Sequence, residues 1–198
     1  MFAKVDDIQK ATEDRACTVQ KSIFLMDEFL KGPMCGRCFP CAFGSYEALL
    51  RLRNIEARQG TEEDLEALRR IAHEMDWASF CKKGKDVAKY FSEYLETEDF
   101  QAHLKGICPT GECKQYIRYK VIGDRCTNCD KCREVCPDNA IIGQKRKSPY
   151  ESGLLPYEVR DQRCSRCGKC YDVCPEGAIV VVQRKTGEVL REKLAVVK

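Results

Sequence analysis

The sequence predicts an α+β protein in which helices fill the N-terminal half and short strands follow in the C-terminal half. Apolar residues recur at helical spacing in several segments between residues 18 and 95. Residues 115–122 and 178–183 instead carry apolar patterns typical of strands. The third observation is the fifteen cysteines among 198 residues, most of them in closely spaced groups. Together these patterns predict a helical bundle followed by a small, cysteine-rich domain.

The helical half is expected to be a bundle of about four helices. Gly60 separates the second predicted helix from the third. Thr61 caps the start of the third helix, with Asp64 at the position of a capping box. Gly32-Pro33 ends the first helix. The apolar periodicity predicts helices over residues 18–31, 46–58, 61–75 and 84–95.

A first group of cysteines, Cys35, Cys38 and Cys41, lies between the first two predicted helices with the spacing C-x2-C-x2-C. Three thiolates at every third position can bind one face of an iron–sulfur cubane. No Cys-Pro follows within three residues, so the group has no fourth ligand of its own and needs a remote one. We therefore expect an iron–sulfur site among loop cysteines at one end of the bundle.

A doubled motif, C-x2-C-x2-C-x3-C-P, occupies residues 126–175. This is the spacing of bacterial proteins with two iron–sulfur clusters, in which the fourth cysteine of each motif ligates the other cluster. A zinc ribbon would need paired C-x2-C knuckles, and an odd cysteine count disfavours complete disulfide pairing. The first [4Fe–4S] cluster is expected on Cys126, Cys129, Cys132 and Cys174. The second is expected on Cys164, Cys167, Cys170 and Cys136.

Three cysteines and one histidine remain outside these motifs. His103, Cys108 and Cys113 are spaced H-x4-C-x4-C in the link between the halves, and Cys17 precedes the first predicted helix. A Cys3His set is typical of a closed, tetrahedral structural zinc site, so we expect Zn²⁺ at this seam. The alternatives are that Cys17 is a buried packing residue and that the link cysteines are free or form a disulfide, which a reducing cytoplasm disfavours. His73 is the poorer ligand because it lies within a predicted helix.

Two segments of the cysteine-rich half leave alternatives open. Residues 143–153 lengthen the connection between the motifs and contain Lys145-Arg146-Lys147. They are either a solvated loop or a docking patch for an acidic electron carrier. The tail, residues 185–198, is either a hairpin or an extension that binds a partner.

Charge and hydropathy exclude several classes of protein. The formal net charge is +3, with Lys and Arg mixed among acidic residues, which does not favour nucleic acid as a partner. The first residues lack the apolar stretch of a secretory signal. The longest aliphatic run, residues 178–182, is too short to span a bilayer. We expect a cytoplasmic metalloprotein without a membrane span.

These motifs resemble known families along nearly the whole chain. Residues 115–183 resemble a bacterial-type two-[4Fe–4S] ferredoxin domain. The upstream half resembles the C-terminal iron–sulfur bundle of the NADH-oxidising flavoprotein subunit of complex I and of the diaphorase subunits of electron-bifurcating hydrogenases. Residues 34–44, M-C-G-R-C-F-P-C-A-F-G, are similar to that family's S-C-G-x-C-x-P-C-R-x-G. The link cysteines within residues 105–114 also resemble the hydrogenase branch.

The resemblance implies that Cys81 is the fourth ligand of the bundle cluster, which gives three [4Fe–4S] clusters in total. It also implies three parts: a helical iron–sulfur bundle over residues 1–104, a cysteine-containing linker over 105–114, and a ferredoxin domain with a tail over 115–198. The chain departs from the family in three respects. It lacks the flavin and NADH domain, Ala42 stands in place of the family's Arg, and the surroundings of Cys81 are more basic.

Three clusters and no organic-cofactor motif describe an electron relay rather than a catalyst. We expect an iron–sulfur electron-transfer subunit of a multi-subunit oxidoreductase, such as an NAD(P)-linked or electron-bifurcating hydrogenase or a formate dehydrogenase. Its expected partners are a flavin-containing, NAD(P)H-binding subunit, other oxidoreductase subunits and soluble ferredoxin. The alternatives are a free polyferredoxin-type carrier and a scaffold module whose clusters are structural.

Overall fold

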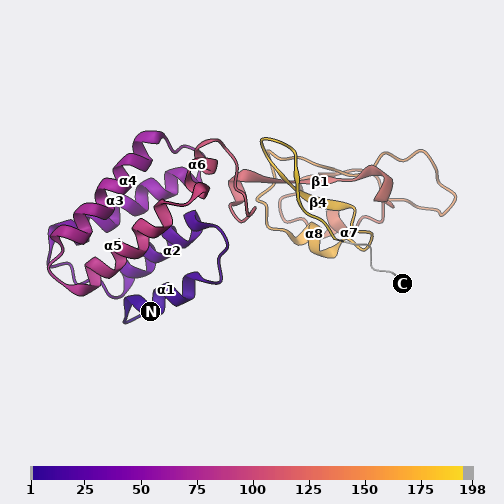
Figure 1. The fold of residues 1–198 in the computed structure, drawn as a ribbon. Helices are drawn as coiled ribbons and strands as arrows, with labels where there is room; N and C mark the ends of the chain where they lie inside the picture. The colour runs from indigo at the N-terminus through magenta and orange to yellow at the C-terminus, as the bar shows by residue number, and fades with distance from the viewer. Residues whose placement is uncertain (1, 194–198) are drawn as a thin grey trace. The chain divides into compact units, whose positions relative to one another are not determined.

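The computed structural model describes residues 2–193 and divides into two compact units, Met1–Gln115 and Tyr116–Lys198. Long helices form the first unit, whereas short strands and short helices form the second (Figure 1). The α+β class predicted from the sequence is confirmed. The two units are described below one at a time.

Six helices lie in the described part of the N-terminal unit. Four long helices are neighbours in a closed series: the second packs on the third, the third on the fourth, the fourth on the fifth, and the fifth on the second. The helices are α1 (Val5–Thr12), α2 (Thr18–Lys31), α3 (Phe39–Glu56), α4 (Glu62–Ala78), α5 (Lys82–Leu95) and α6 (Glu98–Leu104). The sequence did not predict α1 and α6, because both are short and bury too few apolar residues to give a clear period.

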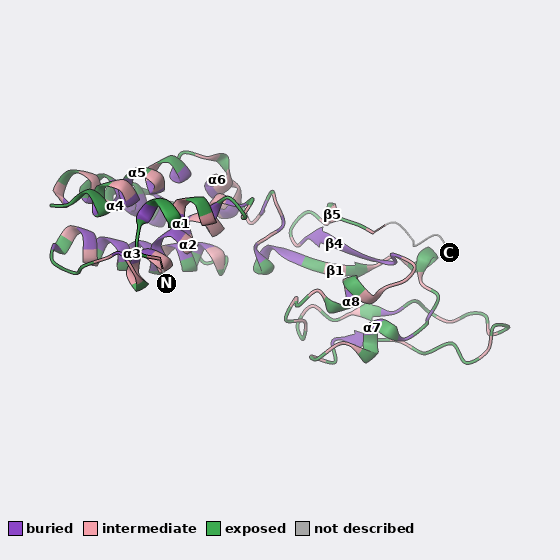
Figure 2. Ribbon diagram, turned by 90° about the horizontal axis from the view of Figure 1, so that it is seen from below, coloured by how far each residue is buried: buried purple, intermediate pink, exposed green. Residues whose placement is uncertain are grey.

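Apolar residues at helical spacing face inward and form the core of this unit (Figure 2). Leu25 and Phe29 of α2, Leu52 of α3, Leu68 of α4 and Phe91 of α5 are all fully buried. Burying a Leu or Phe side chain stabilises a fold by about 1.5–3 kcal/mol each. This core holds the helix ends, and the cysteines next to them, in fixed positions.

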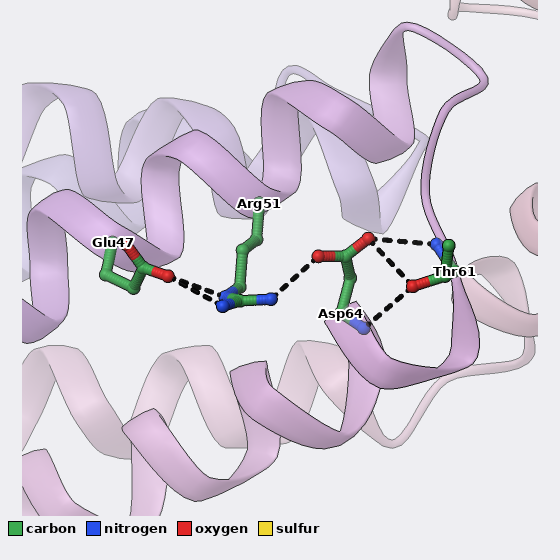
Figure 3. A network of polar contacts seen from close by, with 4 residues as sticks. All are labelled: Glu47, Arg51, Thr61 and Asp64. Carbon is green, nitrogen blue, oxygen red and sulfur yellow. Dashed lines mark hydrogen bonds and ion pairs between the residues drawn. The ribbon is translucent and has the colours of Figure 1, made fainter.

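The predicted capping box at the start of α4 is confirmed, and it is linked to α3 (Figure 3). The Asp64 amide donates to Thr61 Oγ1 at 3.3 Å, and the Thr61 amide donates to Asp64 Oδ2 at 2.9 Å. Arg51 of α3 donates to Asp64 Oδ1 at 2.8 Å and also pairs with Glu47. The capping box therefore fixes the start of α4, and the ion pair between Arg51 and Asp64 joins α3 to α4.

Two helices begin earlier than the sequence indicated. The helix predicted over 46–58 starts at Phe39, because Pro40 is favourable in the first turn, where its missing amide is not needed. Cys41 therefore lies within α3 rather than in a loop. The helix predicted from Gly84 starts at Lys82, directly after Cys81.

Two antiparallel sheets organise the C-terminal unit. In the three-stranded sheet β4 lies between β1 and β5, with Tyr119 opposite Val181. The strands are β1 (Ile117–Val121), β2 (Ile141–Ile142), β3 (Glu158–Val159), β4 (Ile179–Gln183) and β5 (Val189–Arg191), with β2 and β3 forming the second sheet. The short helices are α7 (Lys131–Glu134) and α8 (Lys169–Val173), and 3-10 turns occupy Lys114–Tyr116 and Gly123–Arg125.

The strands predicted in residues 115–122 and 178–183 are confirmed as β1 and β4. Of the two alternatives for the tail, the hairpin holds as far as Arg191, since β5 pairs with β4. Residues 194–198 of the predicted tail lie outside the described residues. Among the described helices, none combines the length and the apolar character that a membrane span requires.

Candidate iron–sulfur and metal centres

The two motifs of the C-terminal unit exchange their fourth cysteines. Cys174 lies with the first triplet, and these four thiols line one pocket together with Ile179 and Tyr157. Cys136 lies with the second triplet, and those four thiols line a separate pocket. The members of the first set are Cys126, Cys129, Cys132 and Cys174. The members of the second set are Cys136, Cys164, Cys167 and Cys170. The sequence predicts the same two sets as cluster ligands, and their binding of clusters stays a prediction.

Both triplet loops wind in the same way. The residues on either side of the middle cysteine have positive φ in each loop: Asn128 (55°) and Asp130 (74°) in the first, Arg166 (60°) and Gly168 (85°) in the second. Left-handed backbone is uncommon outside glycine, although Asn and Asp adopt it most readily. The repeated turns direct the three thiols of each loop toward one point.

Backbone amides already point at the fourth thiols. The Ala140 amide donates to Cys136 Sγ at 3.3 Å, and the Ala178 amide donates to Cys174 Sγ at 3.3 Å. In the second loop the Arg166 amide donates to Cys164 Sγ at 3.4 Å. Donors of this kind stabilise thiolate rather than thiol, and they tune the reduction potential of a bound cluster. The donor chemistry of both pockets fits a [4Fe–4S] cluster.

The pockets are apolar apart from their thiols. Ile141, Tyr157 and Ile179 form a buried cluster with Cys132 and Cys170. Burial is the main cause that raises the pKa of Cys132 to about 11 and of Cys170 to about 12. Binding of a metal must therefore displace protons from these thiols.

In the N-terminal unit Cys41 lies close to Cys38, Cys81 and Cys35. Burial, followed by the charges and a hydrogen bond of these neighbours, raises the pKa of Cys41 to about 12. Cys35 and Cys81 are exposed, whereas Cys38 and Cys41 are buried. Cys38 precedes α3 and Cys81 precedes α5, so the packing of these helices brings the four thiols together.

A buried hydroxyl lies beside this thiol set. Ser79 is 3% exposed, and its Oγ has no hydrogen-bond partner among the described residues. A Cβ placed on Gly84 would lie 2.7 Å from Ser79 Oγ and 3.2 Å from Cys41 Sγ, so both groups approach the first turn of α5. An unsatisfied buried hydroxyl beside a thiol is in position to donate to a thiolate or sulfide. This feature fits a cluster on Cys35, Cys38, Cys41 and Cys81.

The predicted Cys3His set is assembled in the N-terminal unit. The four ligand atoms lie within 4.8 Å of one another, and all four residues are buried. Cys17 Sγ is 3.6 Å from His103 Nε2 and 3.8 Å from Cys113 Sγ, and His103 Nε2 is 3.3 Å from Cys113 Sγ. A tetrahedron with zinc–sulfur bonds of about 2.3 Å separates its sulfur ligands by about 3.7 Å. The 3.8 Å between Cys17 Sγ and Cys113 Sγ is close to that value, and the donor set of Cys17, His103, Cys108 and Cys113 fits one tetrahedral metal ion.

Neighbouring residues orient these ligands. His103 Nδ1 is 2.6 Å from the Asp99 carbonyl, which leaves Nε2 to face the thiols. The Gln20 side-chain amide donates to Cys113 Sγ at 3.3 Å. Both carboxylate oxygens of Glu112 accept amide hydrogens at the start of α2, from Ala16 and Cys17. The link is thereby joined to α2.

Hydrogen bonds couple the protonation of the thiols and the imidazole in this set. Hydrogen bonds from Cys113 and Cys17 lower the pKa of the Cys108 thiol. Burial lowers the pKa of His103, but hydrogen bonds to Cys108 and Cys17 outweigh it and raise the pKa to about 10. The same contacts raise the pKa of Cys113, so binding of Zn²⁺ must displace protons from Cys113 and His103. All fifteen cysteines are free, so the link cysteines do not form a disulfide here.

Family models match both units. Residues 23–104 match the NADH-ubiquinone oxidoreductase-F iron-sulfur binding region, and residues 125–179 match the 4Fe-4S dicluster domain. The chain is therefore similar to an oxidoreductase-F iron–sulfur region in its first unit and to a dicluster domain in its second. The resemblance stated from the sequence is confirmed.

Curated relatives share part of the chain. The NADH-quinone oxidoreductase F subunit of Streptomyces coelicolor is 33% identical over 104 residues, covering 51% of this chain and 23% of the relative. The F 2 subunit of the same kind of enzyme from Rhizobium meliloti is 30% identical over 47% of this chain and 22% of its own length. The beta subunit of the NADP(+)-dependent formate dehydrogenase of Moorella thermoacetica is 36% identical over 34% of this chain and 10% of its own length. The chain thus spans less than a quarter of these relatives.

Sequence reasoning missed the residues that surround the ligands. Gln20, Ser79, Asp99 and Glu112 belong to no motif, and three of them reach their partners across more than eighty residues of chain. The packing of the helices brings these residues to the sites. The Asp99 carboxylate accepts a hydrogen bond from the Thr18 amide at 2.8 Å, at the start of α2. Neither the sequence around Asp99 nor the sequence around Thr18 predicts this contact.

Proposed function

We propose that this protein is an iron–sulfur electron-transfer subunit of an oxidoreductase complex and carries three [4Fe–4S] clusters. The exchange of Cys136 and Cys174 between the two pockets is the observation that carries the proposal. A zinc ribbon or a set of disulfides has no need of that exchange, whereas two adjacent clusters do. Both family models, which describe iron–sulfur domains, support the same function.

The chain's own residues bind and tune the clusters. Thiolates of the three sets hold the iron, and amide donors at Cys136, Cys164 and Cys174 stabilise the thiolate charge. When bound, the clusters supply one-electron carriers with potentials set by charge, hydrogen bonds and exposure. The apolar pocket walls limit access of water to the metal.

The relatives guide the choice of partners. Two of them are named as NADH-quinone oxidoreductase subunits and one as a subunit of a formate dehydrogenase. We propose that a separate flavin-containing, NAD(P)H-binding subunit exchanges electrons with the cluster on Cys35, Cys38, Cys41 and Cys81. The ferredoxin-like clusters would then pass electrons to other subunits or to soluble ferredoxin. Cysteines that serve as metal ligands must stay reduced, which fits the cytoplasm as the compartment of the proposed subunit.

We further propose that Cys17, His103, Cys108 and Cys113 hold a structural Zn²⁺. The sequence placed this site at the seam between the halves, with residues 105–114 as a linker. All four residues belong to the N-terminal unit, which extends to Gln115. The zinc would therefore fasten the segment before β1 to α2 and α6, and so define where the helical unit ends.

Iron and acid-labile sulfide analysis of anaerobically purified protein tests the cluster count. Three four-iron clusters predict about twelve irons per chain. A redox titration followed by electron paramagnetic resonance then measures whether the clusters accept electrons. A reproducible value of about eight irons after full reconstitution would remove the bundle cluster. Clusters that cannot be reduced at physiological potentials would favour a scaffold, and purification without partner subunits would favour a free carrier.

A further inference from the structure

Four aromatic side chains project into solvent at one end of the N-terminal unit. Phe39 is 74%, Phe43 54%, Trp77 82% and Phe80 89% exposed, and together we call them the aromatic face. The rings of Phe39 and Phe43 stack at 5.1 Å between centroids with an interplanar angle of 9°. Single exposed apolar residues are ordinary, but large aromatic side chains gathered at one end of a unit mark an interaction surface.

The aromatic face is hollowed rather than flat. Phe39, Phe43 and Trp77 line a groove between α3 and α4. Ile71, Glu47 and Glu74 also line it. A Cβ on Gly44 would lie 3.0–3.3 Å from Met75 and Ile71, so this glycine lets the two helices approach closely there. A complementary apolar side chain could enter such a groove, as anchor residues do at protein interfaces.

The face is continuous with the bundle thiols. Phe39 directly follows Cys38, and Phe80 directly precedes Cys81. Cys35 and Cys81 are themselves exposed. A protein bound to this face would therefore lie against the proposed cluster, where electron transfer is possible.

The edge of the face nearest the thiols is basic. Arg37, Lys82, Lys83 and Lys85 are exposed, and within residues 2–193 none of the four forms an ion pair. Acidic residues also border the face: Glu47, which pairs with Arg51, and Glu74 line the groove, and Asp76 lines a second hollow together with Trp77, Lys85 and Lys89. Unpaired basic residues around an apolar centre attract an acidic partner and steer its approach.

We propose that the aromatic face is the docking site of an acidic electron-transfer protein whose contact surface has an apolar centre and a carboxylate rim. This proposal rests on the proposed function and adds the partner's chemistry. A second copy of the chain fits poorly, because a twofold contact would bring the same basic edge against itself. Residues 116–198 contain seventeen Lys and Arg against eleven Asp and Glu, so charge does not favour that unit as the occupant either.

Stopped-flow reduction of the iron-loaded protein tests the proposal, with a fully reduced acidic flavodoxin as the probe. In each transfer the flavodoxin loses one electron and one cluster gains it. We expect Trp77→Ser to lower the second-order rate constant at least about tenfold, as loss of an interface anchor does. Lys85→Glu should also lower the rate constant, and should reduce its decline with added salt. Dithionite, which needs no docking, should reduce both variants as fast as the unaltered protein.

Tyr150→Ser is the matched control, because Tyr150 is an equally exposed aromatic residue, 94% accessible, in the other unit. Its rate constant with flavodoxin should be unchanged. Equal rate constants for Trp77→Ser and the unaltered protein would overturn the docking proposal. So would a dimer in sedimentation that Trp77→Ser dissociates, since the face would then belong to a second copy. Clusters that dithionite fails to reduce would instead contradict the proposed function itself.

Discussion

At the scale of single residues, the side-chain hydroxyl of Ser79 is unusual because it is buried without a partner among the described residues. Leaving such a group unsatisfied costs about 1–3 kcal/mol. Its position near Cys41 and the first turn of α5 offers a compensation, since a thiolate or sulfide of a bound cluster would accept a hydrogen bond from the hydroxyl. A donor to cluster sulfur stabilises the reduced, more negative state more than the oxidised one.

We therefore expect Ser79→Ala to lower the midpoint potential of the bundle cluster while iron content stays the same. If the hydrogen bond favours the reduced state by about 1 kcal/mol, the shift is on the order of 40 mV. A redox titration of the anaerobic protein measures it, and Ser79→Thr, which keeps the hydroxyl, is the control. An unchanged potential in Ser79→Ala would mean that the hydroxyl does not contact the cluster.

The chain contains two histidines, and they give a matched pair for the zinc proposal. His103→Ala should lower zinc from about one per chain to well below half, because a closed Cys3His site loses one of its four ligands. Iron should be unaffected. The segment before β1 should become sensitive to protease, since zinc no longer fastens it to α2. Metal analysis and limited proteolysis measure both effects.

His73→Ala is the control, because His73 is exposed on α4 and does not belong to the proposed zinc ligands. It should change neither zinc nor proteolysis. Zinc that persists in His103→Ala, or its absence from protein expressed with ample zinc, would contradict the assignment.

At the scale of elements, the two cysteine loops are repeats that share each other's last ligand. Cys174→Ser should impair the cluster of Cys126, Cys129 and Cys132, and should leave the cluster of its own motif largely intact. Cys136→Ser is the reciprocal variant and should impair the other cluster. Redox titration of the two variants distinguishes the clusters by which signal each one loses. A Cys174→Ser protein that loses the cluster of Cys164, Cys167 and Cys170 would refute the exchange.

The sequence predicted elements well where spacing alone decides. The spacing of the cysteines predicts iron–sulfur ligands, and the apolar residues of the long helices recur at a clear helical period. Apolar periodicity places the starts of α3 and α5 too late, because Pro40 and the residues after Cys81 carry no apolar period although they belong to the first turns of these helices. The charges of residues 143–153, the insert between the two motifs, do not decide between a solvated loop and a docking patch. Asn128 donates to the carbonyls of Gln144 at 3.1 Å and Leu155 at 2.8 Å, so the insert is fastened to the first cysteine loop.

At the scale of the whole molecule, the two units differ in charge as well as in fold. Residues 1–115 carry seventeen Lys and Arg against twenty Asp and Glu, whereas residues 116–198 carry an excess of basic residues. The overall charge of +3 hides this division. The basic edge beside the bundle thiols is therefore a local feature of a unit whose net charge is acidic, and the proposed selection of an acidic partner depends on that edge rather than on the charge of the whole unit.

A relay of this kind should carry electrons without generating them from a nicotinamide. The sequence has no G-x-G-x-x-G loop and no phosphate-binding glycine-rich turn, and its proposed cofactors are metal clusters alone. We therefore expect that NADH or NADPH added to the reconstituted, 198-residue protein leaves the cluster absorption unbleached. Dithionite in a parallel sample should bleach it, which shows that the clusters are competent. Adding a flavoprotein that oxidises NADH should restore bleaching by NADH, because the flavin splits the hydride's electron pair into the single electrons that clusters accept. Bleaching by NADH before any flavoprotein is added would show that the chain binds a nucleotide by itself and would defeat the relay proposal.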